Sequence, residues 1–345
     1  MWFIEIIISV VFITVILSYL SKKYQILVDQ KNISFHKSFV VEKKNTPLLG
    51  GLIFILSLIF FLPVDYLYFK IFIFLIFFVG LLSDINLLRS PTIRILFQVS
   101  IIISYLLLSN NFVLSVRINF IDELMNIFLI KVFFTLFCLL VLINGTNFID
   151  GVNTSAIGYY LLVFSNIFYL SEINNFNLDK LFLFICLASL FSLYLFNFLG
   201  KIFLGDSGSY LIAFVAGIFL IKFSNDNYLV SPYYFVALLW YPAYENLFSI
   251  IRKNIIKKSP STPDTDHLHQ LIFLSLNKYF NIGENFSNTM TGFLICLYNF
   301  IYFIIIFNSY FYTKTLVYSL FFNVIIYSFL YFFLKKKLIQ DKQNG

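Results

Sequence analysis

A short polar segment at residues 203–209 interrupts the apolar sequence and places Asp206 between two glycines in Phe-Leu-Gly-Asp-Ser-Gly-Ser. Because an apolar run follows directly, we expect this segment to form the N-terminus of a helix. Unpaired backbone N–H groups and the helix dipole attract anions at such a terminus, and glycines let a phosphate approach closely. Asp206 can in addition hold a divalent cation. The plain alternative is an N-cap turn built from Asp and Ser.

A second polar segment, residues 144–153, spaces Asn144, Asn147 and Asp150 by three after another apolar run. On a helical turn this spacing places the three side chains on one face. Carboxamides can read a nucleobase or ligate a cation, and Asp150 can accept hydrogen bonds from a base or a ribose. Asn and Gly also favour turns, so a plain polar turn would explain the segment equally well.

A third segment combines an acid with a cation. Ser83 and Asp84 end one apolar run, and Arg94 opens the next after a short turn. A diphosphate requires both kinds of group, because magnesium on oxygen ligands and a guanidinium would share its negative charge. An arginine that marks only the membrane interface is the competing interpretation.

The fourth segment, residues 259–270, contains Asp264 and two of the three histidines, His267 and His269, after a basic stretch from Arg252 to Lys258. A basic loop with histidines suits a phosphate-rich substrate. A zinc site is less favoured, because no cysteine lies nearby. Solvated loop histidines are the simplest alternative.

The sequence between these segments indicates what positions them. The chain of 345 residues is 60% hydrophobic and 21% aromatic, and 12% of its residues are charged, against about a quarter in soluble proteins. This composition predicts an all-α, polytopic membrane protein whose helices cross, or nearly cross, a hydrocarbon core of ~30 Å. About eleven transmembrane helices are expected. They cover residues 3–20, 48–62, 69–82, 93–108, 132–143, 156–170, 181–199, 210–221, 233–251, 291–307 and 316–334.

Basic residues predict the orientation, since Lys and Arg near span ends accumulate on the cytoplasmic side. With the N-terminus outside, all but six of the 24 basic residues and the C-terminus lie on the cytoplasmic side. The net charge of +7 then reflects topology and contact with the bilayer, not nucleic-acid binding. We expect a retained N-terminal anchor and one integral-membrane domain over residues 1–345. The main cytoplasmic loops are expected at residues 21–46, 83–92, 144–155, 200–207 and 252–290.

In this order along the chain, the polar segments resemble those of the polyprenyl-phosphate N-acetylhexosamine-1-phosphate transferases of glycosyl transferase family 4. That family includes undecaprenyl-phosphate GlcNAc-1-phosphate transferases and, more distantly, the translocase that makes the first lipid intermediate of peptidoglycan. A single Gly-Asp-Ser-Gly would be weak support, whereas five motifs in family order are specific. The motifs are Thr46 to Gly51, Gly80 to Asp84, Asn144 to Gly151, Phe203 to Ser209, and Tyr241 to Glu245 with His267-Leu268-His269.

The resemblance implies a Mg²⁺-dependent enzyme, with Mn²⁺ as an alternative ion, in which Asp206 and Asn147 are the metal ligands. It implies that Asp84 is the second acid of an acidic pair and that Asp150 belongs to the nucleotide site, so that these four residues form the catalytic set. The substrate-binding residues that it implies are Arg94, Asn144, Asp264, His267, His269, Lys43 and Lys44.

The implied reaction transfers an (N-acetyl)hexosamine 1-phosphate from a UDP-sugar to undecaprenyl or another polyprenyl phosphate and releases UMP. It would initiate a cell-surface polysaccharide at the cytoplasmic face of the plasma (inner) membrane, and a homodimer is an assembly that the sequence leaves open. Glu245 and Gln270 depart from the usual family residues in a way typical of its surface-polysaccharide branch.

Two alternatives remain from the sequence. Ser83 stands where the family usually has a carboxylate, which favours a catalytically impaired member that binds lipid or acts as a scaffold. A transporter is less favoured, because its acids would lie near mid-membrane on broken helices of related repeats.

Overall fold

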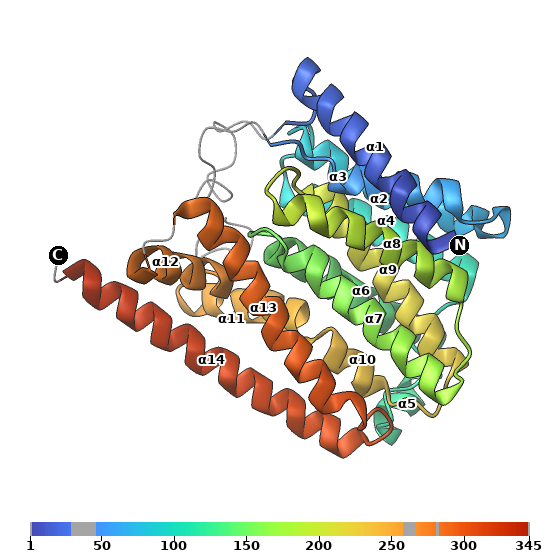
Figure 1. Ribbon diagram of the computed structural model, residues 1–345. Coiled ribbons are helices and arrows are strands. Elements are labelled where there is room, and N and C mark those ends of the chain that lie inside the picture. Colours follow the sequence, from blue (N-terminus) through green and yellow to red (C-terminus); the bar gives the residue numbers. More distant parts are fainter. Residues whose placement is uncertain (1, 29–45, 258–265, 281–282, 344–345) are drawn as a thin grey trace.

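The computed structural model of the protein describes residues 2–28, 46–257, 266–280 and 283–343. Within these ranges the regular structure is helical and no β-strand forms, which confirms the all-α prediction (Figure 1). The helices are α1 (Trp2–Tyr24), α2 (Gly50–Phe61), the 3₁₀ turn η1 (Val64–Tyr66), α3 (Leu67–Asp84), α4 (Pro91–Ser109), α5 (Asn119–Met125), α6 (Phe128–Ile149), α7 (Ser155–Asn174), α8 (Lys180–Phe198), α9 (Gly205–Asp226), α10 (Pro232–Leu238), α11 (Trp240–Ile255), α12 (Leu268–Phe280), α13 (Glu284–Phe307) and α14 (Thr313–Gln343).

Nine helices in the described ranges are long and apolar enough to cross a membrane, namely α1, α3 with η1, α4, α6, α7, α8, α9, α13 and α14. The other two expected spans are built differently. Helix α2 has 12 residues, and its length of about 18 Å falls short of a ~30 Å hydrocarbon core. The expected span at residues 233–251 is divided into α10 and α11. The multi-pass membrane architecture is thus confirmed, whereas the orientation remains a prediction.

The division between α10 and α11 follows from Pro242. Proline has no N–H to bond the carbonyl four residues earlier, and its ring clashes with that carbonyl. The carbonyl concerned is that of Leu238, which instead accepts a hydrogen bond from the buried Tyr159 hydroxyl at 2.7 Å. Helix α11 therefore starts anew at Trp240 and packs against α6.

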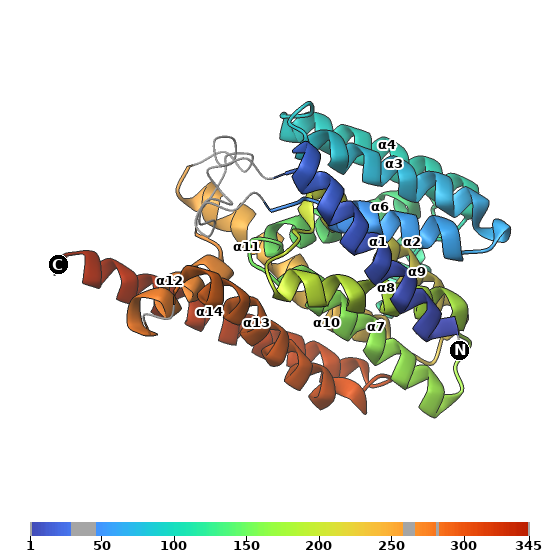
Figure 2. The ribbon, with the colours of Figure 1, turned by 45° about the horizontal axis from the view of Figure 1, so that its top comes forward.

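Helix α9 forms the core of the bundle. It packs against α2, α3 and α6, and its residues from Ser207 to Ile221 are all buried. An apolar surface on every side of the helix is what this central position requires. Gly80 of α3 permits a close approach, because a Cβ atom there would lie 2.4 Å from the Cα of Ser207. The first turn of α9 is thereby held against the last turn of α3 (Figures 1 and 2).

Backbone hydrogen bonds join the segment before α2 to the segment before α9. The Phe203 N–H donates to the Pro47 carbonyl at 2.8 Å, and the Gly50 N–H donates to the Phe203 carbonyl at 3.0 Å. Two of the sequence motifs, far apart along the chain, therefore lie side by side. Their backbone pairing fixes the start of α9, which carries Asp206.

Candidate active site

The N-terminus of α9 is capped by a carboxylate from another helix. Gly205 has a φ of +78°, in the left-handed region that favours glycine. The N–H groups of Asp206 and Ser207 donate to the two oxygens of Asp84 at 2.8 and 3.0 Å, and the Ser207 hydroxyl donates at 2.6 Å. A negative charge at this position also suits the helix dipole. The expectation that these N–H groups are open to a phosphate is therefore wrong, because Asp84 already binds them.

The carboxylate of Asp206 is held by side chains from three other helices. Asn147 of α6 donates its amide N–H to Oδ1 at 2.8 Å. Ser83 of α3 donates its hydroxyl to Oδ2 at 2.6 Å, and Arg94 of α4 donates to the same oxygen at 3.0 Å. About a fifth of the Arg94 side chain and less of Asp206 is exposed, so this ion pair lies at an opening rather than on an open surface. We call Ser83, Arg94, Asn147 and Asp206 the aspartate cluster.

Ser83 bridges the two charges of the aspartate cluster. Its hydroxyl accepts a hydrogen bond from Arg94 Nη1 at 2.7 Å while it donates to Asp206. The Tyr210 hydroxyl accepts from the same guanidinium nitrogen at 3.3 Å. A serine here leaves Asp206 beside a guanidinium and a neutral hydroxyl, where an acid would add a second negative charge. Ser83, which stands where the family usually has a carboxylate, therefore takes part in the hydrogen bonds of the cluster.

The three polar residues expected on one face of α6 take different positions. Asn147 reaches Asp206, and its amide also donates to the Ser209 hydroxyl at 3.1 Å. Asn144 donates to the Leu140 carbonyl of its own helix at 2.8 Å. Asp150 is the C-cap residue of α6, and its N–H donates to the Thr146 carbonyl. The spacing by three thus brings one of the three residues into the aspartate cluster.

A second group of polar side chains lies next to the first. The ring of Phe148 is 5.1 Å from that of His267, which links the end of α6 to this group. His267 Nδ1 lies 2.8 Å from Glu245 Oε1, and the Tyr327 hydroxyl of α14 donates to Glu245 Oε2. The His267 N–H donates to the Gln270 side-chain carbonyl at 2.9 Å. We call Glu245, His267, His269, Gln270 and Tyr327 the histidine cluster.

The histidine cluster is dry. The side chains of Glu245 and His267 are 1% and 8% exposed, so their hydrogen bonds are shielded from water. His269 stacks on His267 with ring centres 5.6 Å apart and lies against the backbone at Gly151. Burial lowers the pKa of His269 to about 3, and the adjacent His267 acts in the same direction while Glu245 opposes. Its buried Nδ1 has no hydrogen-bond partner among the described residues.

The structure therefore brings together Asp84, Arg94, Asn147 and Asp206 in one place and His267 with His269 in the adjoining one. Three predicted residues, Lys43, Lys44 and Asp264, lie outside the described residues. The sequence did not point to Tyr210 or Tyr327, because each is one of the 23 tyrosines of the chain and stands within an apolar run. Glu245 was named as the end of a family motif and as a departure from the usual family residue, and the structure shows that it holds the histidine cluster together.

The donors around Asp206 fit a magnesium ion that shares its coordination with a substrate. No group of three or more His, Cys, Asp or Glu residues suited to a metal occurs in the described ranges. Magnesium, however, commonly takes one or two carboxylates and completes its shell with substrate phosphates and water. The Asp206 carboxylate and the Asn147 carboxamide oxygen, exposed by a turn of that amide, supply such a partial set. An ion held by protein groups alone does not fit.

Fold and clusters together define a polytopic helical membrane protein with an Asp–Arg pair where several helices end. Residues 66–224, from the end of η1 to near the end of α9, match the family model described as glycosyl transferase family 4. This range contains the whole aspartate cluster. This stretch of the chain is therefore similar to glycosyl transferase family 4, in agreement with the resemblance of its motifs.

Two named proteins are also similar to parts of the chain. The chain is 34% identical over 80 residues to the undecaprenyl-phosphate alpha-N-acetylglucosaminyl 1-phosphate transferase of Thermotoga maritima, covering 23% of this chain and 26% of that protein. It is 29% identical over 128 residues to the probable undecaprenyl-phosphate N-acetylglucosaminyl 1-phosphate transferase of Bacillus subtilis, covering 36% of each. The similarity thus spans about a quarter of the length of the first relative and about a third of the length of the second.

Proposed function

We propose that the protein transfers a sugar 1-phosphate of the N-acetylhexosamine class from a UDP-sugar to a polyprenyl phosphate and releases UMP. The observation that carries this proposal is the aspartate cluster, in which one carboxylate and one guanidinium meet between four helices. The activities for which the two relatives are named support the acceptor and the transferred group. We further propose that the reaction initiates a surface polysaccharide at the cytoplasmic face of the plasma membrane.

In this reaction an oxygen of the lipid phosphate attacks the β-phosphorus of the donor. The new P–O bond forms as the bond from the β-phosphorus to the bridging oxygen breaks, and UMP leaves with that oxygen. Phosphoryl transfer of this kind depends on positioning and on neutralising charge. A phosphate monoester is largely ionised at neutral pH, because its second pKa is about 6. The nucleophile therefore requires little help from a base.

Each part of the aspartate cluster has a task in this proposal. Arg94 pairs with donor or acceptor phosphate oxygens, and Ser83 and Tyr210 keep its guanidinium aimed at Asp206. Asp84 acts as a positioning residue, since it caps α9 and fixes the direction of Asp206. The end of α6 at Asp150 offers polar groups to the nucleotide or sugar.

Magnesium, or manganese in its place, would be held by Asp206 and Asn147. When bound, it would supply positive charge to the diphosphate and to the departing UMP. Because Arg94 already balances the charge of Asp206, the protein alone attracts a divalent cation weakly. A donor diphosphate adds the missing negative charge, so we expect metal and donor to bind together.

The test is a UMP-release assay on the purified protein in detergent with undecaprenyl phosphate, Mg²⁺ and a panel of UDP-N-acetylhexosamines. UMP release that requires both the lipid and the metal, and that occurs with one UDP-sugar of the panel, supports the proposal. An impaired lipid-binding protein is the alternative, and it predicts no release from any donor despite retained binding of the lipid. That second result would overturn the proposal.

A further inference from the structure

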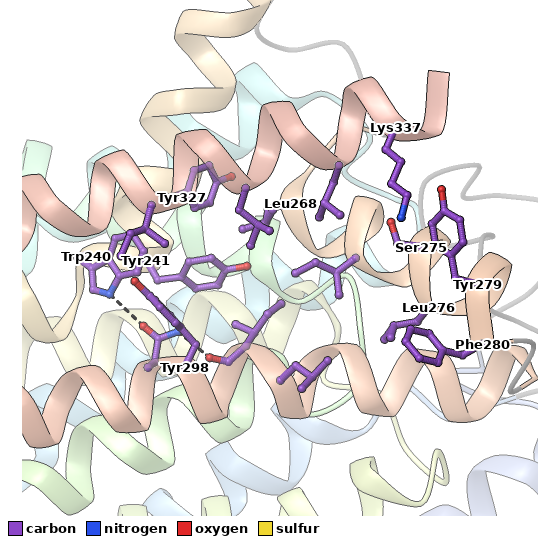
Figure 3. A pocket seen from close by; sticks show the side chains of 17 residues that line it. Trp240, Tyr241, Leu268, Ser275, Leu276, Tyr279, Phe280, Tyr298, Tyr327 and Lys337 are labelled. Carbon is purple, nitrogen blue, oxygen red and sulfur yellow. Dashed lines mark hydrogen bonds between the residues drawn. The ribbon is translucent and has the colours of Figure 1, made fainter. Parts of the chain in front are cut away.

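A narrow apolar groove runs between α11, α12, α13 and α14, away from the aspartate cluster and beside the histidine cluster (Figure 3). Its volume is about 440 Å³. Trp240 and Tyr241 lie at one end, and Tyr279 and Lys337 lie at the other end. Its inner end is closed by a hydrogen bond of 2.9 Å from Trp240 Nε1 to the Asn299 side-chain oxygen.

The groove exists because two consecutive helices are held by different neighbours. Helix α13 packs on α7 and α12, whereas α14 packs on α10 and α12. Close to the turn that joins α13 and α14, tyrosine side chains bridge the two helices. The Tyr302 hydroxyl is 3.0 Å from that of Ser319, and Tyr298 bonds Asn323. Beyond these bridges the space between the helices remains as the groove.

An apolar groove beside membrane-spanning helices calls for an apolar occupant. Water requires two to four polar partners to be held in a cavity, and the wall here is almost entirely apolar. If the groove is empty, the side chains that line it lose dispersion contacts on one side. The bilayer supplies acyl chains at this depth. An acyl chain has apolar surroundings both in the groove and in the bilayer. Any preference for one lipid must therefore come from its headgroup.

The length and the charge of the groove favour one kind of lipid. Along α14 the lining runs from Ile326 to Lys337, which is about 16 Å at 1.5 Å per residue. This is about the hydrocarbon thickness of one leaflet. Lys337 Nζ lies 3.9 Å from the centre of the Tyr279 ring, whereas the nearby Lys335 is paired with Asp266 at 2.7 Å. Among the described residues, Lys337 has no carboxylate within ion-pair distance.

We propose that this groove binds one acyl chain of an anionic glycerophospholipid whose phosphate lies at Lys337. A lysine at the cytoplasmic end of a span attracts such headgroups. The polyprenyl phosphate acceptor is a different lipid, because its phosphate must reach Arg94 and Asp206. Helix α14 lies on the opposite side of the molecule from α3 and α4 in both overall views (Figures 1 and 2).

The groove also touches the histidine cluster. Tyr327 lines the groove and donates its hydroxyl to Glu245, which in turn holds His267. A bound acyl chain therefore packs against Tyr327, which helps to position the histidine cluster. We expect anionic phospholipid to stabilise this cluster, and any resulting gain in turnover rests on the proposed function.

The experiment compares Lys337→Glu with Lys336→Glu, a matched control on the same helix that does not line the groove. Each protein is incorporated into nanodiscs with equal amounts of phosphatidylglycerol and phosphatidylcholine, released into detergent, and examined by native mass spectrometry. The wild type and Lys336→Glu should retain phosphatidylglycerol over phosphatidylcholine. Lys337→Glu should lose roughly five- to tenfold of that retention.

A second variant tests the groove without changing charge. Ser275→Trp places a large ring at the mouth of the groove, and it should abolish retention of the lipid while thermal unfolding shows that the protein remains folded. Equal retention by the Lys337 and Lys336 variants, retention of phosphatidylcholine alone, or polyprenyl phosphate as the retained species would each overturn the proposal. Because the experiment measures bound lipid, it tests the groove proposal independently of the transferase activity.

Discussion

The aspartate cluster and the histidine cluster adjoin each other, yet they are built in opposite ways. The first joins full charges at an opening, with the Arg94 and Asp206 side chains 21% and 15% exposed. The second is closed to water, and Glu245 accepts hydrogen bonds from two sides within it. The region that matches the glycosyl transferase family, residues 66–224, contains the first cluster and not the second.

This contrast separates two tasks. A charged group that must contact a phosphate has to be accessible to it. A few fixed hydrogen-bond partners keep the group in the required orientation. A buried acid must have its hydrogen bonds satisfied, or it destabilises the protein. We infer that the aspartate cluster carries the proposed reaction and that the histidine cluster holds the start of α12 against α11. Changes in the first should therefore alter rate, and changes in the second should alter stability as well.

Asp206→Asn should have the largest effect on rate. Loss of this charge should lower UMP release about 100- to 1000-fold, since the asparagine cannot balance Arg94 or attract a divalent cation. The apparent Tm should change little, because an amide still hydrogen-bonds Asn147 and Ser83. Asp226→Asn, at the exposed far end of the same helix, is the matched control and should keep its rate. A similar loss in both variants would contradict a special role for Asp206.

Glu245→Ala should show the opposite balance. It leaves Tyr327 and His267 without their shared acceptor, which costs about 2 kcal/mol of folding free energy. We expect a lower apparent Tm in detergent and a smaller loss of rate than for Asp206→Asn. Glu172→Ala removes a surface ion pair with Lys180 and should change the Tm little. An unchanged Tm for Glu245→Ala would remove the distinction between the clusters.

Ser83→Ala tests whether the bridge within the aspartate cluster matters. The variant loses a hydroxyl that bonds both Arg94 and Asp206, and we expect a rate loss of about tenfold from the loss of these two hydrogen bonds to charged groups. Ser83→Thr keeps the hydroxyl and should retain most of the rate. If alanine and threonine behave alike, the hydroxyl has no part in the reaction.

The smallest effect concerns the response to pH. The pKa of His269 is about 3 in the folded protein because of burial, against an ordinary value of 6.5. Between these values the unfolded chain binds the extra proton, so the contribution of His269 to stability is complete above pH 6.5 and falls as the pH is lowered towards 3. His269→Asn should flatten the decline of Tm across this window. An equally steep decline in the variant would show that other groups cause it.

Short motifs predicted the aspartate cluster well. Asp206 before an apolar run gave the start of α9, and Arg94 and Asn147 were expected at the same end of the bundle. These signals are local, because a polar residue at the end of an apolar segment has few places to lie. The role of Asp84 was not visible, since a carboxylate that binds metal and one that caps a distant helix look alike in sequence.

Partners that come from apolar segments could not be predicted. Tyr327 stands in a run of aromatic residues with no local signal, although it completes the histidine cluster from α14. Pro242 was noted within a family motif, but its effect, the division of one expected span into α10 and α11, depends on Tyr159 taking up the freed carbonyl of Leu238. Such pairings are set by tertiary packing, which periodicity does not record.

The cap on α9 has a consequence for how the protein is made. Asp84 is synthesised 122 residues before the N–H group of Asp206 that it binds. At ribosomal rates of 5 to 20 residues per second, this corresponds to roughly 6 to 25 s. During that interval α3 is present without its central partner, and the aspartate cluster does not yet exist. A nascent chain released before α9 would therefore be an incomplete bundle that lacks Asp206.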